Sequence, residues 1–170
     1  MAENNTVILS WGECDVYLKE AGETTYKKEP KPVDQSTTVE PSEGEKLEAK
    51  TEGGKLEAAM QLANSYLAKY QLRVAESKNS NITHINGVVD GEFSLAIVPK
   101  NKAAMGVVID RSSVSVLDST FNSKEGIVDE YRYTVLEPAN GSKMVKRGVL
   151  TVTGDDTDGY TITGSGKDFE

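Results

Sequence analysis

The chain has 170 residues, of which 37% are hydrophobic and 27% charged, and it carries a formal net charge of -8 with a pI near 4.8. This length suits one domain, or one domain with an appended arm, and so acidic a chain does not bind nucleic acid by neutralising phosphates with clustered Lys and Arg. A single cysteine, Cys14, and a single histidine, His84, exclude an internal disulfide, a four-cysteine zinc site and any mechanism that needs two imidazoles. We expect no membrane span and no secretion signal, because the sequence lacks a long apolar run and a basic, then apolar, start.

The first predicted elements are two short strands. Thr6–Trp11 is a β-branched apolar run that ends at Gly12, which is typical of a buried strand. Cys14–Leu18 alternates apolar with more polar residues and predicts a second strand. Cys14 itself is expected to be a small buried hydrophobic residue, since no second thiol lies near it.

Residues 19–54 differ in character from the strands before them. This stretch contains three of the five prolines, repeated Thr and many Glu and Lys, with few apolar residues. Such a composition buries too little apolar surface to pack alone, so we predict an extended arm that neighbouring subunits order. Within it, Thr37–Val39 and Lys46–Lys50 are candidate strands that form against a partner.

Residues 55–76 fit two patterns. Leu56, Met60, Ala63, Leu67, Tyr70 and Val74 have helical spacing, and the Ala, Leu and Glu content favours a helix. Residues 66–74 also alternate strictly, which predicts a β-hairpin with a turn at Asn64–Ser65. The pattern alone does not choose between the two.

The rest of the chain predicts short strands separated by turns. Glu92–Val98 places alternate apolar residues on one face, and further strands are predicted at Met105–Ile109, Ser113–Leu117, Glu130–Leu136, Lys143–Thr153 and Gly159–Thr163. The Asp and Gly residues of 154–159 predict a hairpin turn between the last two strands. The fold class that follows is mainly β: a β-sandwich or closed β-barrel with at most one short helix and a long arm in its N-terminal half, forming a single domain over residues 1–170.

No set of residues points to catalysis, a metal or a cofactor. Asp155, Asp156 and Asp158 resemble part of a calcium loop but lack its distal Glu, so they predict a polar turn. His84 lies in a polar connection and is expected to be solvated. Gly53–Gly54 falls in an acidic loop and not at a strand-to-helix turn followed by Lys, so it predicts no phosphate cradle.

The order of these segments resembles the tail tube and tail-tube-like structural proteins of phages from Bacteroides-type hosts. The resemblance covers most of residues 6–150 and rests on Trp11-Gly12, Cys14-Asp15-Val16, residues 44–50 (GEKLEAK), Glu52-Gly53-Gly54, Gly91-Glu92-Phe93, Ile109-Asp110-Arg111, residues 113–116 (SVSV), residues 131–134 (YRYT) and residues 136–139 (LEPA). It implies a virion protein without catalytic residues, assembled in the bacterial host cytoplasm. It also favours a hairpin over 55–76, although the Ala and Leu of 56–63 depart from the family pattern.

The resemblance further implies self-association. Proteins of this kind join edge strands into rings, commonly of six, and a long arm docks each ring on the next, so that DNA passes through an acidic lumen without specific binding. The partners implied are other copies of the chain and other phage tail proteins. In this chain the candidate inter-subunit or lumen-facing residues are acids of the predicted arm: Glu40, Glu43, Glu45, Glu48 and Glu52. A loop surface that these acids merely solvate is the alternative.

Two other hypotheses fit the sequence. One is a capsid decoration or tail-terminator or connector protein, which has the same fold class and a different place in the particle. The other is a carbohydrate- or protein-binding β-sandwich module, which needs an exposed aromatic platform. Trp11, at the end of a predicted buried strand, is a poor candidate for that platform.

Overall fold

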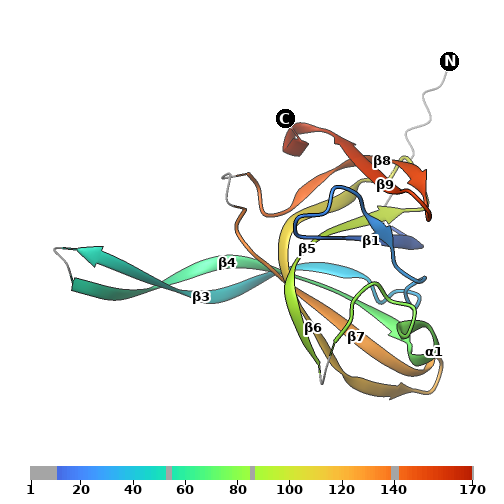
Figure 1. Ribbon diagram of the computed structural model, residues 1–170, viewed down its shortest axis with the longest axis horizontal. Coiled ribbons are helices and arrows are strands. Elements are labelled where there is room, and N and C mark those ends of the chain that lie inside the picture. The colour runs from blue at the N-terminus through green and yellow to red at the C-terminus, as the bar shows by residue number, and fades with distance from the viewer. Residues whose placement is uncertain (1–10, 53–54, 85–86, 139–141, 170) are drawn as a thin grey trace, which may run out of the picture.

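A computed structural model describes residues 11–52, 55–84, 87–138 and 142–169, and within these ranges the chain is mainly β, with one nine-stranded antiparallel sheet and one short helix (Figure 1). The prediction of a mainly β fold with at most one short helix is confirmed, and the described strands do not close into a barrel. The strands are β1 Cys14–Glu20, β2 Lys27–Lys28, β3 Thr38–Glu52, β4 Lys55–Arg73, β5 Val88–Pro99, β6 Gly106–Asn122, β7 Gly126–Val135, β8 Lys146–Asp155 and β9 Gly159–Ser165. The helix α1 spans Val74–Ser77, and a single 3-10 turn, η1, spans Lys167–Phe169.

The sheet branches at β6. Its strand order is β2-β1-β5-β6-β7-β4-β3, and β8 joins the first residues of β6 while β9 pairs with β8. β6 therefore pairs with β8 over 106–108 and with β7 over 112–122. Because the first half of β6 turns toward β8 and the second half toward β7, the sheet can cover two separate groups of apolar side chains.

The core lies on both faces of β1, β5 and the start of β6. Val16 and Leu18 of β1 belong to the larger cluster, whereas Tyr17 between them packs into a second cluster with Tyr26 and Leu150. β5 and β6 repeat this division: the larger cluster takes Leu95, Ile97, Val107 and Ile109, and the smaller one takes Ala96 and Val108. Strands buried on both faces form the centre of a layered β structure.

Residues 55–73 form one strand. β4 pairs with β3 from Lys55 to Lys69 and with β7 from Leu67 to Arg73, so inter-strand hydrogen bonds outweigh the helix propensity of its Ala and Leu residues. The prediction of a β-hairpin was right that residues 55–73 are extended and wrong that a turn lies at Asn64–Ser65. Asn64 and Ser65 pair in register with Glu43 and Ser42, because the second strand of the hairpin is the earlier segment 38–52.

The predicted arm is too long at its N-terminal end. β1 extends to Glu20, and Tyr26, Glu29 and Val33 are buried in the body of the protein. These side chains hold residues 19–37 in place although the segment is poor in apolar residues. The part of the chain that projects is instead the paired β3 and β4.

Two further predicted strands, Met105–Ile109 and Ser113–Leu117, are parts of the single strand β6, since the two serines at 112–113 stay in register with β7. The strands predicted at Glu92–Val98, Glu130–Leu136 and Gly159–Thr163 correspond to β5, β7 and β9. The strand predicted over Thr6–Trp11 lies outside the described residues except for Trp11. Over the part of the chain that the structure describes, no helix has the length and hydropathy needed to cross a membrane.

Candidate functional site

The β3–β4 hairpin projects from the body as a two-stranded ribbon (Figure 1, left). β3 and β4 are antiparallel over their whole paired length, from the Thr38–Lys69 pair to the Glu52–Lys55 pair. Beyond Leu67, toward the tip, β4 pairs with β3 alone. A two-stranded ribbon is at best marginally stable in water, so this part of the chain gains little from its own contacts.

The register divides the hairpin into an apolar and a charged series of positions. Since side chains alternate along a strand, directly paired positions share a face. One series is almost entirely uncharged and consists of the pairs Val39–Ala68, Pro41–Tyr66, Glu43–Asn64, Glu45–Leu62, Leu47–Met60, Ala49–Ala58 and Thr51–Leu56. The other series holds the remaining charges of the hairpin, among them the pairs Lys50–Glu57 and Glu52–Lys55.

The apolar series continues the core. Ala68, Tyr70 and Leu72 of β4 are buried in the larger cluster, and Tyr66 and Val39 pack partly buried against it. Every second residue of β4 continues this series through Leu62 and Met60 into the projecting part of the strand. The sequence thus carries a core-type pattern along β4 beyond Leu67, into the part of the strand that pairs with β3 alone.

The structure separates the five glutamates predicted as a surface into two groups. All five lie on β3, and Glu40 is exposed. Glu43 and Glu45 occupy positions of the apolar series, whereas Glu40, Glu48 and Glu52 occupy positions of the charged series. For Glu43, Glu45, Glu48 and Glu52 only the backbone register is described, and their side chains lie outside the described part of the structure.

A hollow of about 670 Å³ lies at the root of the hairpin. Apolar side chains from three parts of the chain surround it: Trp11 near the start, Val39 and Tyr66 of the hairpin, and Met144 and Val145 before β8. The Trp11 indole N–H donates to the carbonyl of Met105 at 2.8 Å, and the ring is partly buried. Trp11 is therefore held at the edge of the core, as the sequence suggested, and is not an open platform for a sugar.

A buried carboxylate ties the hairpin root to the body. Glu29 is 3% exposed, and its two oxygens accept hydrogen bonds from the Tyr70 hydroxyl (2.8 Å), the Ser80 hydroxyl (2.6 Å) and the backbone and side-chain nitrogens of Asn81 (2.6 and 2.9 Å). Since the Tyr70 hydrogen is donated to Glu29, the Tyr133 hydroxyl, 2.7 Å away, donates to Tyr70. Burial raises the pKa of Tyr70 and Tyr133 well above the ordinary tyrosine value, which keeps both neutral.

Sequence patterns did not predict this network, because Glu29 lies in the Pro- and Lys-rich stretch that was predicted to be an extended arm. Tyr131 and Tyr133 were correctly expected in a strand, whereas the pattern alone left Tyr70 open between helix and strand. Tyr131 also stacks on Tyr70, with ring centroids 5.3 Å apart. Three tyrosines and one carboxylate thus fix the start of the hairpin.

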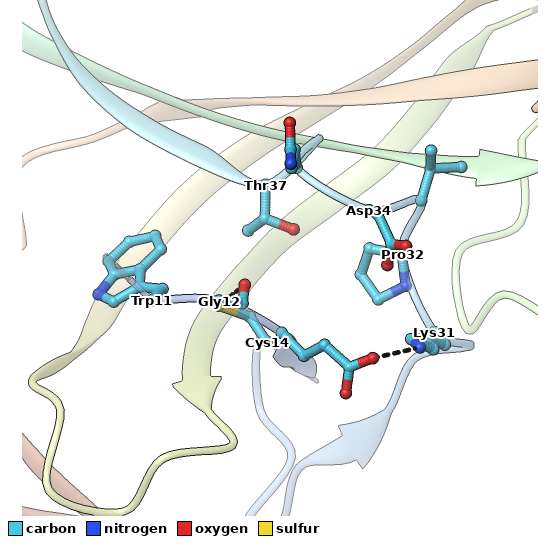
Figure 2. A pocket seen from close by; sticks show the side chains of 10 residues that line it. Trp11, Gly12, Cys14, Lys31, Pro32, Asp34 and Thr37 are labelled. Atoms are coloured by element: carbon cyan, nitrogen blue, oxygen red, sulfur yellow. Dashed lines mark hydrogen bonds and ion pairs between the residues drawn. The ribbon is translucent and has the colours of Figure 1, made fainter. Parts of the chain in front are cut away.

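A second hollow, beside β1, is lined by apolar residues such as Trp11 and Pro32 together with charged ones such as Lys31 and Asp34 (Figure 2). Glu13 accepts a hydrogen bond from Lys31 at 2.7 Å, and Lys100 lies 2.7 Å from its other oxygen. These hydrogen bonds, that from Lys100 first, lower the pKa of Glu13 to about 2. Cys14 is half-buried here, and desolvation raises the pKa of its thiol to about 11, so the thiol is a poor nucleophile at neutral pH.

The other predicted polar sites remain isolated. Asp155 accepts hydrogen bonds from the backbone N–H groups of Thr157 and Asp158, as expected for the predicted turn between β8 and β9. His84 is exposed. Within the described ranges, no three His, Cys, Asp or Glu side chains stand close enough to hold a metal ion.

Comparison with protein-family models and with curated proteins found no match to this chain.

Proposed function

We propose that this chain is a structural subunit of a phage virion, most specifically a tail tube subunit that self-assembles into stacked rings forming a conduit for DNA. The observation that carries the proposal is the β3–β4 hairpin, whose apolar series continues the core pattern into the part of the ribbon where β4 pairs with β3 alone. A second copy laid against the hairpin would bury these positions and pair the free edge of β3.

The charge of the chain supports the same function. At -8, the subunit would repel DNA phosphates and let the polymer slide through without adhering. Residues 1–55 hold 12 of the 27 acids, and five of these lie on β3. Acids on the projecting strand suit either an inter-ring surface or a lumen wall.

The test is assembly of the full-length chain. We expect rings or tubes by negative-stain electron microscopy as the concentration rises, with a matching shift in sedimentation velocity. A chain that stays monomeric at every concentration, with or without other tail proteins, would contradict the proposal.

A matched variant removes the hairpin and keeps its root. Replacing residues 43–64 by Asn-Gly leaves the Ser42–Ser65 pair to flank a two-residue turn, and this pair lies an even number of steps from the Glu52–Lys55 pair that ends the natural hairpin. We expect this variant to keep the unfolding temperature of the body within a few degrees and to lose assembly. Undiminished assembly of the truncated chain would show that the hairpin is not the contact.

A further inference from the structure

The hollow at the root of the hairpin, which we name the hairpin-root hollow, is lined by apolar side chains that the described residues cover only in part. Val39, Tyr66, Met144 and Val145 all line it, and each is partly buried against the larger core cluster. Val107 and Pro41 add to the apolar wall, and Lys143 and Arg147 complete it. An apolar segment that covered these side chains would gain free energy by removing them from water.

Trp11 is the point at which the start of the chain meets the hairpin-root hollow. It is the one residue that this hollow shares with the hollow beside β1, whose wall also includes Gly12, Glu13 and Cys14 (Figure 2). The chain after Trp11 therefore runs along the hollow beside β1. The segment before Trp11 begins at the wall of the hairpin-root hollow.

The residues opposite this part of the chain indicate its direction. The hollow beside β1 is lined by residues 31–35 and Thr37, whereas the hairpin-root hollow is lined by Val39 and Pro41. Going backward along the chain from Cys14 to Trp11 thus leads past residues of rising number. The same course, continued beyond Trp11, crosses the hairpin-root hollow.

We propose that residues 6–10 of this same chain, which read TVILS and lie outside the described residues, dock in the hairpin-root hollow. None of the five is charged, and Val7, Ile8 and Leu9 are aliphatic. Alternate side chains of an extended segment share a face, so Val7 and Leu9 point the same way as Trp11 and enter the hollow, whereas Ile8 faces away. Five extended residues reach about 17 Å, which is enough to cross a hollow of about 670 Å³.

The chain's own segment is the favoured occupant because it is tethered beside the hollow. The Trp11 indole N–H donates to the carbonyl of Met105 at 2.8 Å, which holds the end of the segment at the wall. A tethered segment binds at a high effective concentration, so a copy from another molecule competes poorly. Once docked, residues 6–10 brace the start of β3 where the hairpin leaves the body. This inference does not depend on the proposed self-assembly, and it is tested on dilute, unassembled chain.

The fluorescence of Trp11 provides the first test, since it is the only tryptophan in the chain. Leu9→Asp should raise the acrylamide quenching of Trp11 about twofold, because a carboxylate does not stay in an apolar hollow and the segment undocks. The matched control is Ile8→Asp, which adds the same charge on the opposite face and should leave quenching as in the natural chain. Equal quenching in the two variants, with the far-ultraviolet circular dichroism of the natural chain, would overturn the proposal.

A cross-link identifies the occupant. In a Cys14→Ser background, we expect Leu9→Cys/Val145→Cys treated with a short bis-maleimide to give a cross-linked monomer in dilute solution. A covalent dimer from a mixture of the two single variants would show that the segment of a neighbouring copy fills the hollow, and the absence of any cross-link would show that the segment does not dock. Either result contradicts the proposal, and neither bears on whether the chain forms rings.

Discussion

The body and the β3–β4 hairpin both contain alternating apolar positions along their strands, but these positions have different neighbours in the two regions. In the body, Val16, Tyr17 and Leu18 are all buried, because clusters lie on both faces of β1. In the hairpin, positions 56–62 continue an apolar series with only the cross-strand partner opposite. The comparison shows a core-type pattern that continues where β3 and β4 pair only with each other, which is the part of the chain that the proposed assembly would bury.

The hydrogen bonding of polar groups also differs between the body and the β3–β4 hairpin. The carboxylate of Glu29 is buried and fully hydrogen-bonded within the body. The outer edge of β3 pairs with no other strand in the described part of the chain. Free strand edges are a hazard for a monomer, which assembly removes. The following predictions test this division between a self-sufficient body and a hairpin that depends on neighbours.

The largest contrast is expected from one aliphatic truncation in each region. Ile109→Ala, at a fully buried position in β6, should lower the free energy of unfolding by about 2–5 kcal/mol, since it removes buried methyl groups and leaves a cavity. Leu47→Ala, at a position paired only with Met60, should change monomer stability by less than about 0.5 kcal/mol and weaken assembly at least tenfold. Urea unfolding and sedimentation velocity measure the two effects. A large loss of monomer stability for Leu47→Ala would mean that the hairpin is part of the body's own core.

A second prediction concerns the network that joins the two regions. Glu29→Ala leaves the buried Tyr70 hydroxyl and the partly buried donors of Ser80 and Asn81 without their acceptor and should cost about 3 kcal/mol, measured by urea unfolding. Glu29→Gln keeps the shape and one acceptor oxygen and should cost about 1 kcal/mol. Equal costs for the two variants would show that side-chain volume, and not hydrogen bonding, holds the hairpin root.

The smallest effect at neutral pH is that of a pH dependence that belongs to the body. Burial raises the pKa of Tyr70 and Tyr133 in the folded chain, so above the unfolded value near 10 the unfolded chain loses protons that the folded chain keeps. Stability should therefore be unaffected by these groups below about pH 9 and fall above pH 10 by about 1.4 kcal/mol per pH unit for each tyrosine. Urea unfolding between pH 8 and 11.5 measures the slope, and Tyr133→Phe should make it shallower. An unchanged slope in Tyr133→Phe would mean that this hydroxyl ionises as easily in the folded chain as in the unfolded one.

Local pattern was enough to determine much of the fold. The alternation of residues 92–98 and 130–136 predicted β5 and β7, and the Asp and Gly residues of 154–159 predicted the β8–β9 turn, because strand faces and tight turns depend on residues close in the chain. The mainly β class followed from several such segments.

The tertiary structure decided the features that depend on distant partners. Whether residues 55–73 were helix or strand turned on pairing with β3 and β7, which supply backbone hydrogen bonds that no local propensity reveals. Glu29 became a buried acceptor because Tyr70, Ser80 and Asn81, 41 to 52 residues away, converge on it.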